Sequence, residues 1–108
     1  LRRPRRLEGG STLSFGDLSY DVDLKQLSCK GRTLTLSHRE GALLELFLRN
    51  PGQTIPRSSI LSRVWGPDAE VEDGNLDNYI YFLRRRLKSL NSSLSLKTIR
   101  GVGYQLEV

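Results

Sequence analysis

Methionine is absent from this chain of 108 residues, and cysteine and histidine occur once each. The single cysteine, Cys29, cannot form a disulfide within the chain, which fits a reducing cytosol. Its alternation with Leu27 favours a small buried sheet residue over a nucleophile. Because His38 is the only histidine, the sequence offers no nucleophile–base pair and no cluster of metal ligands. We therefore expect no catalytic residue, no metal and no cofactor.

Long apolar runs are also lacking. No stretch approaches the ~20 apolar residues that cross a bilayer, and no signal-peptide pattern opens the chain, so we expect no membrane partner. A start at Leu1 in a chain without methionine predicts a piece of a longer protein, with something before Leu1. Residues 1–11 combine Pro4, arginines and paired glycines, and are predicted to be a linker. Residues 12–108 are long enough for one domain with one core.

Charge is unevenly distributed along the chain, which has a net charge of +5. Residues 75–108 hold six basic and two acidic side chains, whereas residues 66–74 hold four acidic side chains and no basic one. Positive charge gathered on the last third indicates an anionic partner there.

Alternating apolar residues between 11 and 36 predict three or four short antiparallel strands with one buried face, with a hairpin tip at Lys30–Arg32. A helix should begin at Ser37, because Ser37 and Glu40 fit a capping box, and should end at residues 50–52. A second helix is predicted from about Arg57 to Trp65, a third over residues 75–90, and a final hairpin from strands 96–99 and 104–108. This order of elements predicts an α+β fold, a winged helix-turn-helix with an N-terminal four-stranded antiparallel sheet, three helices and a C-terminal β-hairpin wing.

The predicted third helix has two contrasting faces. Its apolar stripe consists of Leu76, Ile80, Leu83, Leu87 and Leu90. The opposite side holds Asn78, Tyr81, Phe82, Arg85 and Ser89. A solvated face would explain the arginines alone, but two outward aromatic rings expose apolar surface without stabilising the fold, which favours a binding face. Such a helix, ~24 Å long, fits a DNA major groove about 12 Å wide but not the groove of A-form RNA.

Five segments together resemble, in order and spacing, the effector domain of OmpR/PhoB-type bacterial response regulators. They are residues 34–40, 50–52, 62–66 (Ser-Arg-Val-Trp-Gly), 75–87 and 98–104 (Thr-Ile-Arg-Gly-Val-Gly-Tyr). The resemblance covers about residues 12–108. It implies sequence-specific binding of double-stranded DNA for transcription regulation in a two-component system, in the bacterial cytoplasm. It also implies a receiver domain before the linker, head-to-tail dimers on direct-repeat promoter sites, and contact with RNA polymerase.

The resemblance assigns further roles to individual residues. Arg100 corresponds to an arginine that the wing inserts into the minor groove, with a salt bridge to the acidic loop as the alternative. Thr98 corresponds to a contact close to the DNA backbone, and the Trp65 indole to a phosphate contact, although a core role is the alternative for Trp65. The loop between the second and third helices would face RNA polymerase through Asp68, Glu70, Glu72 and Asp73, or be an ordinary solvated loop. Gly101 and Gly103 are expected to adopt positive φ and narrow the wing.

The base-reading positions depart from the family pattern, which often has Val-His before the central isoleucine where this chain has Asn78-Tyr79. From chemistry alone, Arg85 is expected to read guanine or to bind a phosphate, and Asn78 to read adenine or to fix a phosphate. Tyr81 and Phe82 suit thymine methyl groups, or packing against a neighbouring loop or protomer. Phosphate contacts are predicted for Arg84, Lys88 and, beside a free helix N-terminus, Arg57. A winged helix that binds only proteins is the main rival, because exposed rings would serve it equally well.

Overall fold

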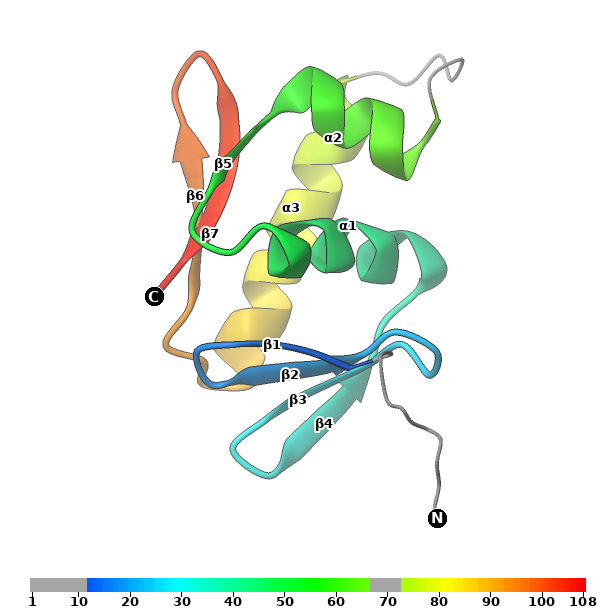
Figure 1. Ribbon diagram of the computed structural model, residues 1–108, viewed down its shortest axis with the longest axis vertical. Helices are drawn as coiled ribbons and strands as arrows, with labels where there is room; N and C mark the ends of the chain where they lie inside the picture. The colour runs from blue at the N-terminus through cyan, green and yellow to red at the C-terminus, as the bar shows by residue number, and fades with distance from the viewer. Residues whose placement is uncertain (1–11, 67–72) are drawn as a thin grey trace.

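Two antiparallel sheets lie beside three helices in the computed structural model, which describes residues 12–66 and 73–108 except for the side chains of 73–75 (Figure 1). The predicted linker over residues 1–11 therefore lies outside the described residues. The elements are β1 Thr12–Phe15, β2 Leu18–Asp21, β3 Gln26–Cys29, β4 Arg32–Thr35, α1 His38–Arg49, β5 Thr54–Pro56, α2 Arg57–Val64, α3 Asp73–Ser89, β6 Ser95–Ile99 and β7 Gly103–Glu107.

The first sheet has the strand order β1-β2-β3-β4, which confirms the predicted four-stranded antiparallel sheet. Its buried face carries Leu18, Tyr20, Leu27 and Cys29, so the cysteine is the core residue that its alternation predicted. The hairpin between β3 and β4 turns through Lys30 and Gly31, both at positive φ, as a two-residue turn requires.

Helix α1 begins where the capping box predicted. The Ser37 hydroxyl accepts a hydrogen bond from the Glu40 amide, and the Glu40 carboxylate accepts one from the Ser37 amide. Glu40 is buried, and its second oxygen lies 3.4 Å from Nε of Arg86 on α3. The buried charge is therefore paired, and α1 and α3 are joined at this point.

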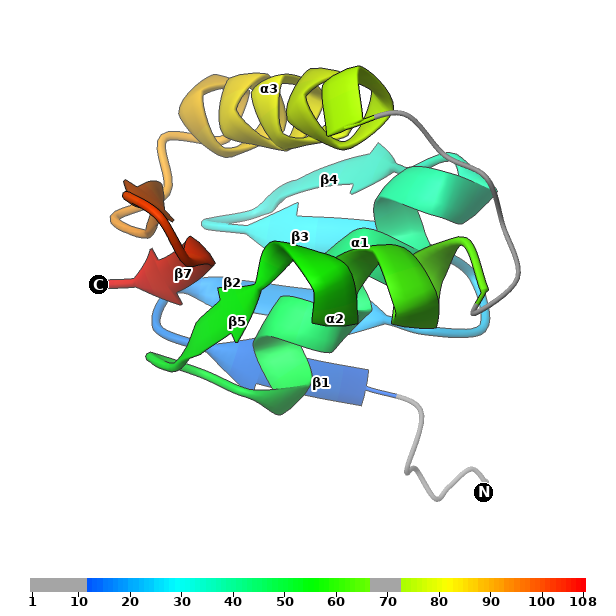
Figure 2. The same ribbon diagram turned by 90° about the horizontal axis from the view of Figure 1, so that it is seen from above.

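Helix α3 crosses behind α1 and α2 in Figure 1, and Figure 2 shows it along one side of the molecule. It starts at Asp73, two residues before the predicted start, and ends at Ser89. Its predicted apolar stripe is at most 4% exposed, from Leu76 to Leu90. Among the described residues, no helix is both long and apolar enough to cross a membrane.

The second sheet has the order β5-β7-β6, so the predicted C-terminal hairpin is joined by a strand that the sequence did not predict. Strand β5 has three residues and ends in proline, and only its pairing with β7 makes it a strand. Gly101 has the expected positive φ of 75°. The expectation for Gly103 was wrong, because no positive φ occurs there; a Cβ atom at Gly103 would lie 2.0 Å from the Ile55 carbonyl oxygen, so close packing against β5 requires glycine.

Candidate nucleic-acid interface

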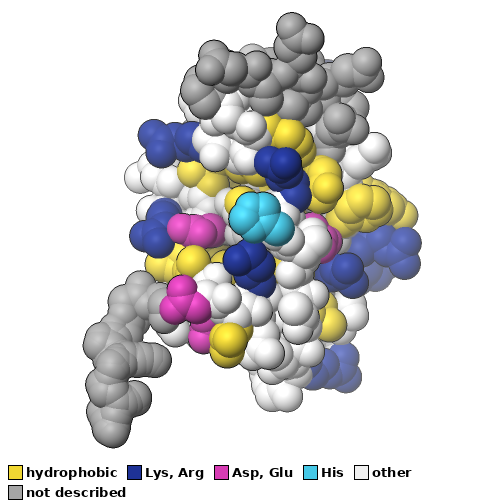
Figure 3. Space-filling view, turned by 90° about the vertical axis from the view of Figure 1, so that its right-hand side faces the viewer, with side chains coloured by type: hydrophobic (Ala, Val, Ile, Leu, Met, Phe, Trp, Pro, Cys, Tyr) yellow, Lys and Arg dark blue, Asp and Glu magenta, His cyan; other side chains and the backbone are white. Residues whose placement is uncertain are grey.

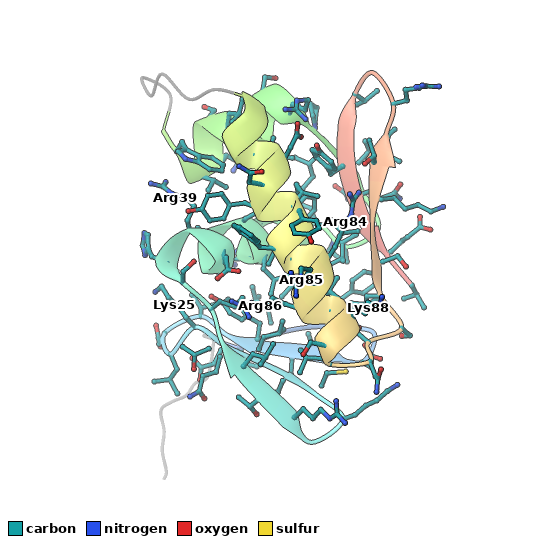
Figure 4. The ribbon with its side chains drawn as sticks, turned by 180° about the vertical axis from the view of Figure 1, so that it is seen from behind. Lys25, Arg39, Arg84, Arg85, Arg86 and Lys88 are labelled. Atoms are coloured by element: carbon teal, nitrogen blue, oxygen red, sulfur yellow. The ribbon has the colours of Figure 1, made fainter. Side chains whose placement is uncertain are left out.

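The side of α3 that faces away from the core is exposed, as the helical spacing predicted. Asn78, Arg85 and Ser89 are all exposed there, and the two rings between them are 54% exposed at Tyr81 and 44% at Phe82. In Figure 4 this side of α3 faces the viewer, with Arg85 near its centre. The Tyr81 and Phe82 rings therefore do not pack into the core of the same chain, which leaves them available to a partner.

Ring contacts hold these aromatic side chains in a defined arrangement. Trp65 and Tyr79 are T-shaped with ring centroids 5.6 Å apart, and the Tyr79 and Phe82 centroids are 6.0 Å apart. Tyr81 lies 6.0 Å from Phe82, and Cζ of Arg85 lies 5.8 Å from the Tyr81 ring centroid. Edge-to-face and cation–π geometry of this kind favours fixed ring positions. The outward face is thus partly preorganised.

Hollows lie on both sides of the ridge that α3 forms. One, of ≈ 620 Å³, is lined by Tyr81, Arg84, Arg85, Lys88 and Ser89. The other, of ≈ 290 Å³, is lined by Phe82, Arg85, Arg86 and Ser89. In Figure 3, Lys and Arg side chains lie beside hydrophobic ones along the right-hand edge of the molecule. A protruding helix with basic hollows on either side matches the shape and charge of a groove between two phosphate backbones.

Arg84 and Thr98, two predicted contacts, meet one another. Arg84 donates from Nε to the Leu96 carbonyl and from Nη2 to the Thr98 hydroxyl, both at 2.8 Å. Figure 4 shows Arg84 and Lys88 on the side of α3 nearest the hairpin, and Arg86 on the opposite side. Arg84 therefore joins α3 to β6, whereas Lys88 is exposed beside the larger hollow.

Arg57 lies at the junction of three elements. Its Nη1 donates to Oδ1 of Asp77 and to the Tyr104 hydroxyl, both at 2.8 Å, and the Tyr104 hydroxyl also donates to Asp77. Hydrogen bonds from Tyr104 and Arg57 lower the pKa of Asp77. The pKa of Tyr104 is raised, mainly by burial and secondly by its hydrogen bond to Asp77. We expected the N-terminus of α2 to be free to bind a phosphate. This expectation was wrong for the first amide of the helix, because the Arg57 N–H donates to the Val102 carbonyl at 3.1 Å.

Trp65 is half-buried against the core, in line with the structural alternative for this residue. Arg39 lies over the indole with Cζ 5.1 Å from its centroid, and its Nη1 donates to the Val64 carbonyl at 2.6 Å. Arg39 could not be singled out from its position in the chain, because its partners Val64 and Trp65 are remote in sequence.

Arg100 is exposed in the turn between β6 and β7, next to Val102, which is 47% exposed. Val102 was not predicted as a surface residue of interest. Asp68, Glu70 and Glu72 lie outside the described residues, as does the side chain of Asp73, so the polymerase-facing loop remains a prediction.

Side chains from the β1–β2 turn and from β4 hold the end of α3 and the residues that follow it. Asp17 accepts hydrogen bonds from the Ser92 hydroxyl at 2.6 Å and the Ser93 amide at 2.7 Å, which lower the pKa of Asp17 to about 2. Arg32 donates to the Ser89 carbonyl at 3.1 Å, and a cation at a helix C-terminus is favourable. The N-terminal sheet thus supports the helix that carries the exposed face.

Comparison with known proteins adds independent findings. The family model described as "Transcriptional regulatory protein, C terminal" matches residues 31–106. The chain is 35% identical over 105 residues to the transcriptional regulatory protein DltR of Streptococcus agalactiae, covering 97% of this chain and 47% of DltR. It thus spans about half the length of the curated relatives it matches.

Two solved structures have the same architecture. The DNA-binding domain of E. coli CadC has a TM-score of 0.81 and 28% identity, with 91% of this chain and 92% of that chain covered. The Klebsiella pneumoniae RstA DNA-binding domain, solved in complex with the RstA box, has a TM-score of 0.75 and 28% identity, with 89% and 96% covered. Both likenesses agree with the predicted winged helix-turn-helix.

Proposed function

Since this chain belongs to the family of C-terminal domains of transcriptional regulatory proteins, the OmpR/PhoB-type effector domains, we propose that it binds specific sites in double-stranded DNA to regulate transcription. Helix α3 enters the major groove, and the turn between β6 and β7 enters the adjacent minor groove. The observation that carries this proposal is the contrast between the two faces of α3. One is fully buried in the core, and the other exposes two aromatic rings and an arginine between basic hollows.

The side chains divide into base-reading and backbone-binding groups. Arg85, at the centre of the exposed face, reads guanine, and Asn78 reads adenine. Tyr81 and Phe82 lack a paired donor and acceptor, so they contact thymine methyl groups. Lys88, beside the larger hollow, binds a phosphate and thereby contributes affinity and register without sequence information.

The contacts within the fold limit what the remaining predicted residues do. Arg84 is held by the hairpin, so its phosphate contact uses the outer edge of a guanidinium that is already oriented. Arg57 is paired with Asp77, so it acts at the junction of α2, α3 and β7. Trp65 presents only the exposed part of its indole to the DNA backbone. Arg100 enters the minor groove from the hairpin turn, where groove width and potential rather than bases are read.

The whole protein has further partners under this proposal. A receiver domain precedes residues 1–11, a second copy binds head-to-tail on direct repeats, and RNA polymerase meets the loop that contains Asp68, Glu70, Glu72 and Asp73. The relatives are about twice as long as this chain, which leaves room for such a domain. A bacterial chromosome lies in the cytoplasm, so the proposed function places the protein there.

Selection from a random pool of duplex DNA tests the proposal directly. We expect a recurring half-site, with repeats spaced by about one helical turn when dimers bind. Affinity for the selected duplex should fall steeply with salt, because each phosphate contact contributes about 0.9 to the log–log slope. Failure to enrich any sequence, together with no duplex binding at low salt, would leave the protein-only winged helix as the better explanation.

A further inference from the structure

Helix α3 is joined to the hairpin by side chains at two separate points. At the first, a single oxygen of Asp77 accepts hydrogen bonds from both Arg57 and the Tyr104 hydroxyl. Arg57 also donates to the Tyr104 hydroxyl, so α2, α3 and β7 meet at one carboxylate. Tyr104 is buried, which leaves its hydroxyl as the polar tip that reaches α3.

The second point lies seven residues further along α3, or about 10 Å at 1.5 Å per residue. There Arg84 donates to the Leu96 carbonyl and to the Thr98 hydroxyl of β6. A single contact would fix the distance between α3 and the hairpin at one point, but the hairpin could still rotate about that point relative to the helix. Two contacts spaced along the same helix fix the angle between α3 and the hairpin.

Magnitudes indicate that these contacts act on geometry more than on stability. The Asp77 side chain is 56% exposed and that of Arg57 31%, and exposed ion pairs contribute at most about 1 kcal/mol. The backbone already attaches the hairpin to α2, through the pairing of β5 with β7 and the bond from the Arg57 amide to Val102. Apolar packing in the shared core also brings the hairpin against α3, and the polar side chains add directional hydrogen bonds to that contact at two points.

We propose that Asp77 and Arg84, through Tyr104 and Thr98, are positioning residues that set the offset in base pairs between the major-groove contacts of α3 and the minor-groove contact of Arg100. This inference rests on the proposed function and deepens it. The DNA target is then a half-site with a narrow minor groove at one fixed distance, and a displaced narrow segment is rejected. Neutralisation of Asp77 by Arg57 also reduces its repulsion of nearby phosphates.

The test measures tolerance to displacement. Two duplexes carry the selected half-site with an A·T-rich flank either at its selected position or moved by one base pair. The wild type should bind the displaced duplex roughly tenfold more weakly, the usual cost of a mismatched position. Tyr104→Phe removes the hydroxyl but keeps the ring. It should lower the displacement ratio, which is the affinity for the selected duplex divided by that for the displaced duplex, to about two- or threefold. Thr98→Val removes one of the two hydrogen bonds at the second point, that from Arg84 to the exposed Thr98 hydroxyl, and should act in the same direction.

Glu107→Gln is the matched control. It removes the 3.1 Å ion pair between Lys97 and Glu107, which joins β6 to β7 without touching α3. This control should keep the wild-type ratio. A thermal melt of each variant verifies that it folds, and Thr98→Val keeps the test valid if Tyr104→Phe does not.

A double-mutant cycle with Arg100→Ala completes the experiment. In the wild type, Arg100→Ala should weaken binding to the selected duplex; in the Tyr104→Phe and Thr98→Val backgrounds the same change should have a smaller effect. Equal effects in all backgrounds, with unchanged displacement ratios, overturn the inference while leaving DNA binding intact. A wild type that binds the site but is indifferent to Arg100→Ala overturns both the inference and the role of the hairpin. No binding to any duplex contradicts the proposed function itself.

Discussion

Arg85→Ala separates base reading from phosphate binding at the centre of the exposed face. The Arg85 guanidinium lies over the Tyr81 ring, 5.8 Å from its centroid, so it is already directed along the outer face of α3. A bidentate arginine–guanine pair contributes about 1–3 kcal/mol of discrimination, or roughly 5- to 150-fold. We therefore expect Arg85→Ala to weaken the selected site by a factor in this range and a scrambled duplex far less. The expected ratio of selected to scrambled affinity falls accordingly.

Fluorescence anisotropy with labelled duplexes at several salt concentrations measures both effects at once. Arg63→Ala is the matched control, because it removes the same charge from an exposed arginine of α2 that lines a hollow with α1, away from α3. It should leave the selected-to-scrambled ratio unchanged. Equal losses on both duplexes, together with a salt slope reduced by about 0.9, would identify a phosphate contact and refute base reading by Arg85.

Three further predictions concern the rings, the hairpin and the support of α3. Replacing contacted thymines by uracil should weaken wild-type binding by about 0.8 kcal/mol per methyl group, measured by anisotropy, and Phe82→Ala should abolish part of that difference. Gly103→Ala should lower the free energy of unfolding, measured by urea titration, by about 3 kcal/mol, because the new Cβ would clash with the Ile55 carbonyl. Gly31→Ala is the control: the space around Gly31 is open, so the substitution should lower the free energy of unfolding by only about 1–2 kcal/mol, the strain of a positive φ. Asp17→Asn should cost about 2 kcal/mol at pH 7; because the native pKa is depressed, that difference should be complete above pH 3.8 and vanish as pH falls through about 2.

Local signals made much of the fold predictable. The capping box at Ser37 and the two-residue turn at Lys30 and Gly31 each depend on residues that are close in sequence. The apolar stripe of α3 repeats over five positions, so its buried side follows from helical geometry alone. The exposure of Tyr81 and Phe82 was predictable for the same reason, since they occupy the side opposite that stripe.

Long-range partners were not predictable, because the sequence carries no periodic mark of them. Strand β5 has three residues, and its strand character comes from pairing with β7 about fifty residues later. Asp17 is similarly paired with Ser92 and Ser93 across most of the chain. Gly103 looked like a residue needed for positive φ, whereas the neighbour that actually requires glycine is the backbone of β5.

Arg84 shows that residue type and helix position were enough to predict which residues lie at the proposed interface, but not the role of each one. Its charge and its place on α3 indicated a phosphate contact, while its partners Leu96 and Thr98 make it a link to the hairpin. These roles are compatible, because a guanidinium has five N–H donors in one plane and the hairpin contacts use only part of that set. A phosphate bound by Arg84 would therefore also hold the angle between α3 and β6. Affinity for the DNA backbone and the geometry of base reading would then depend on the same side chain.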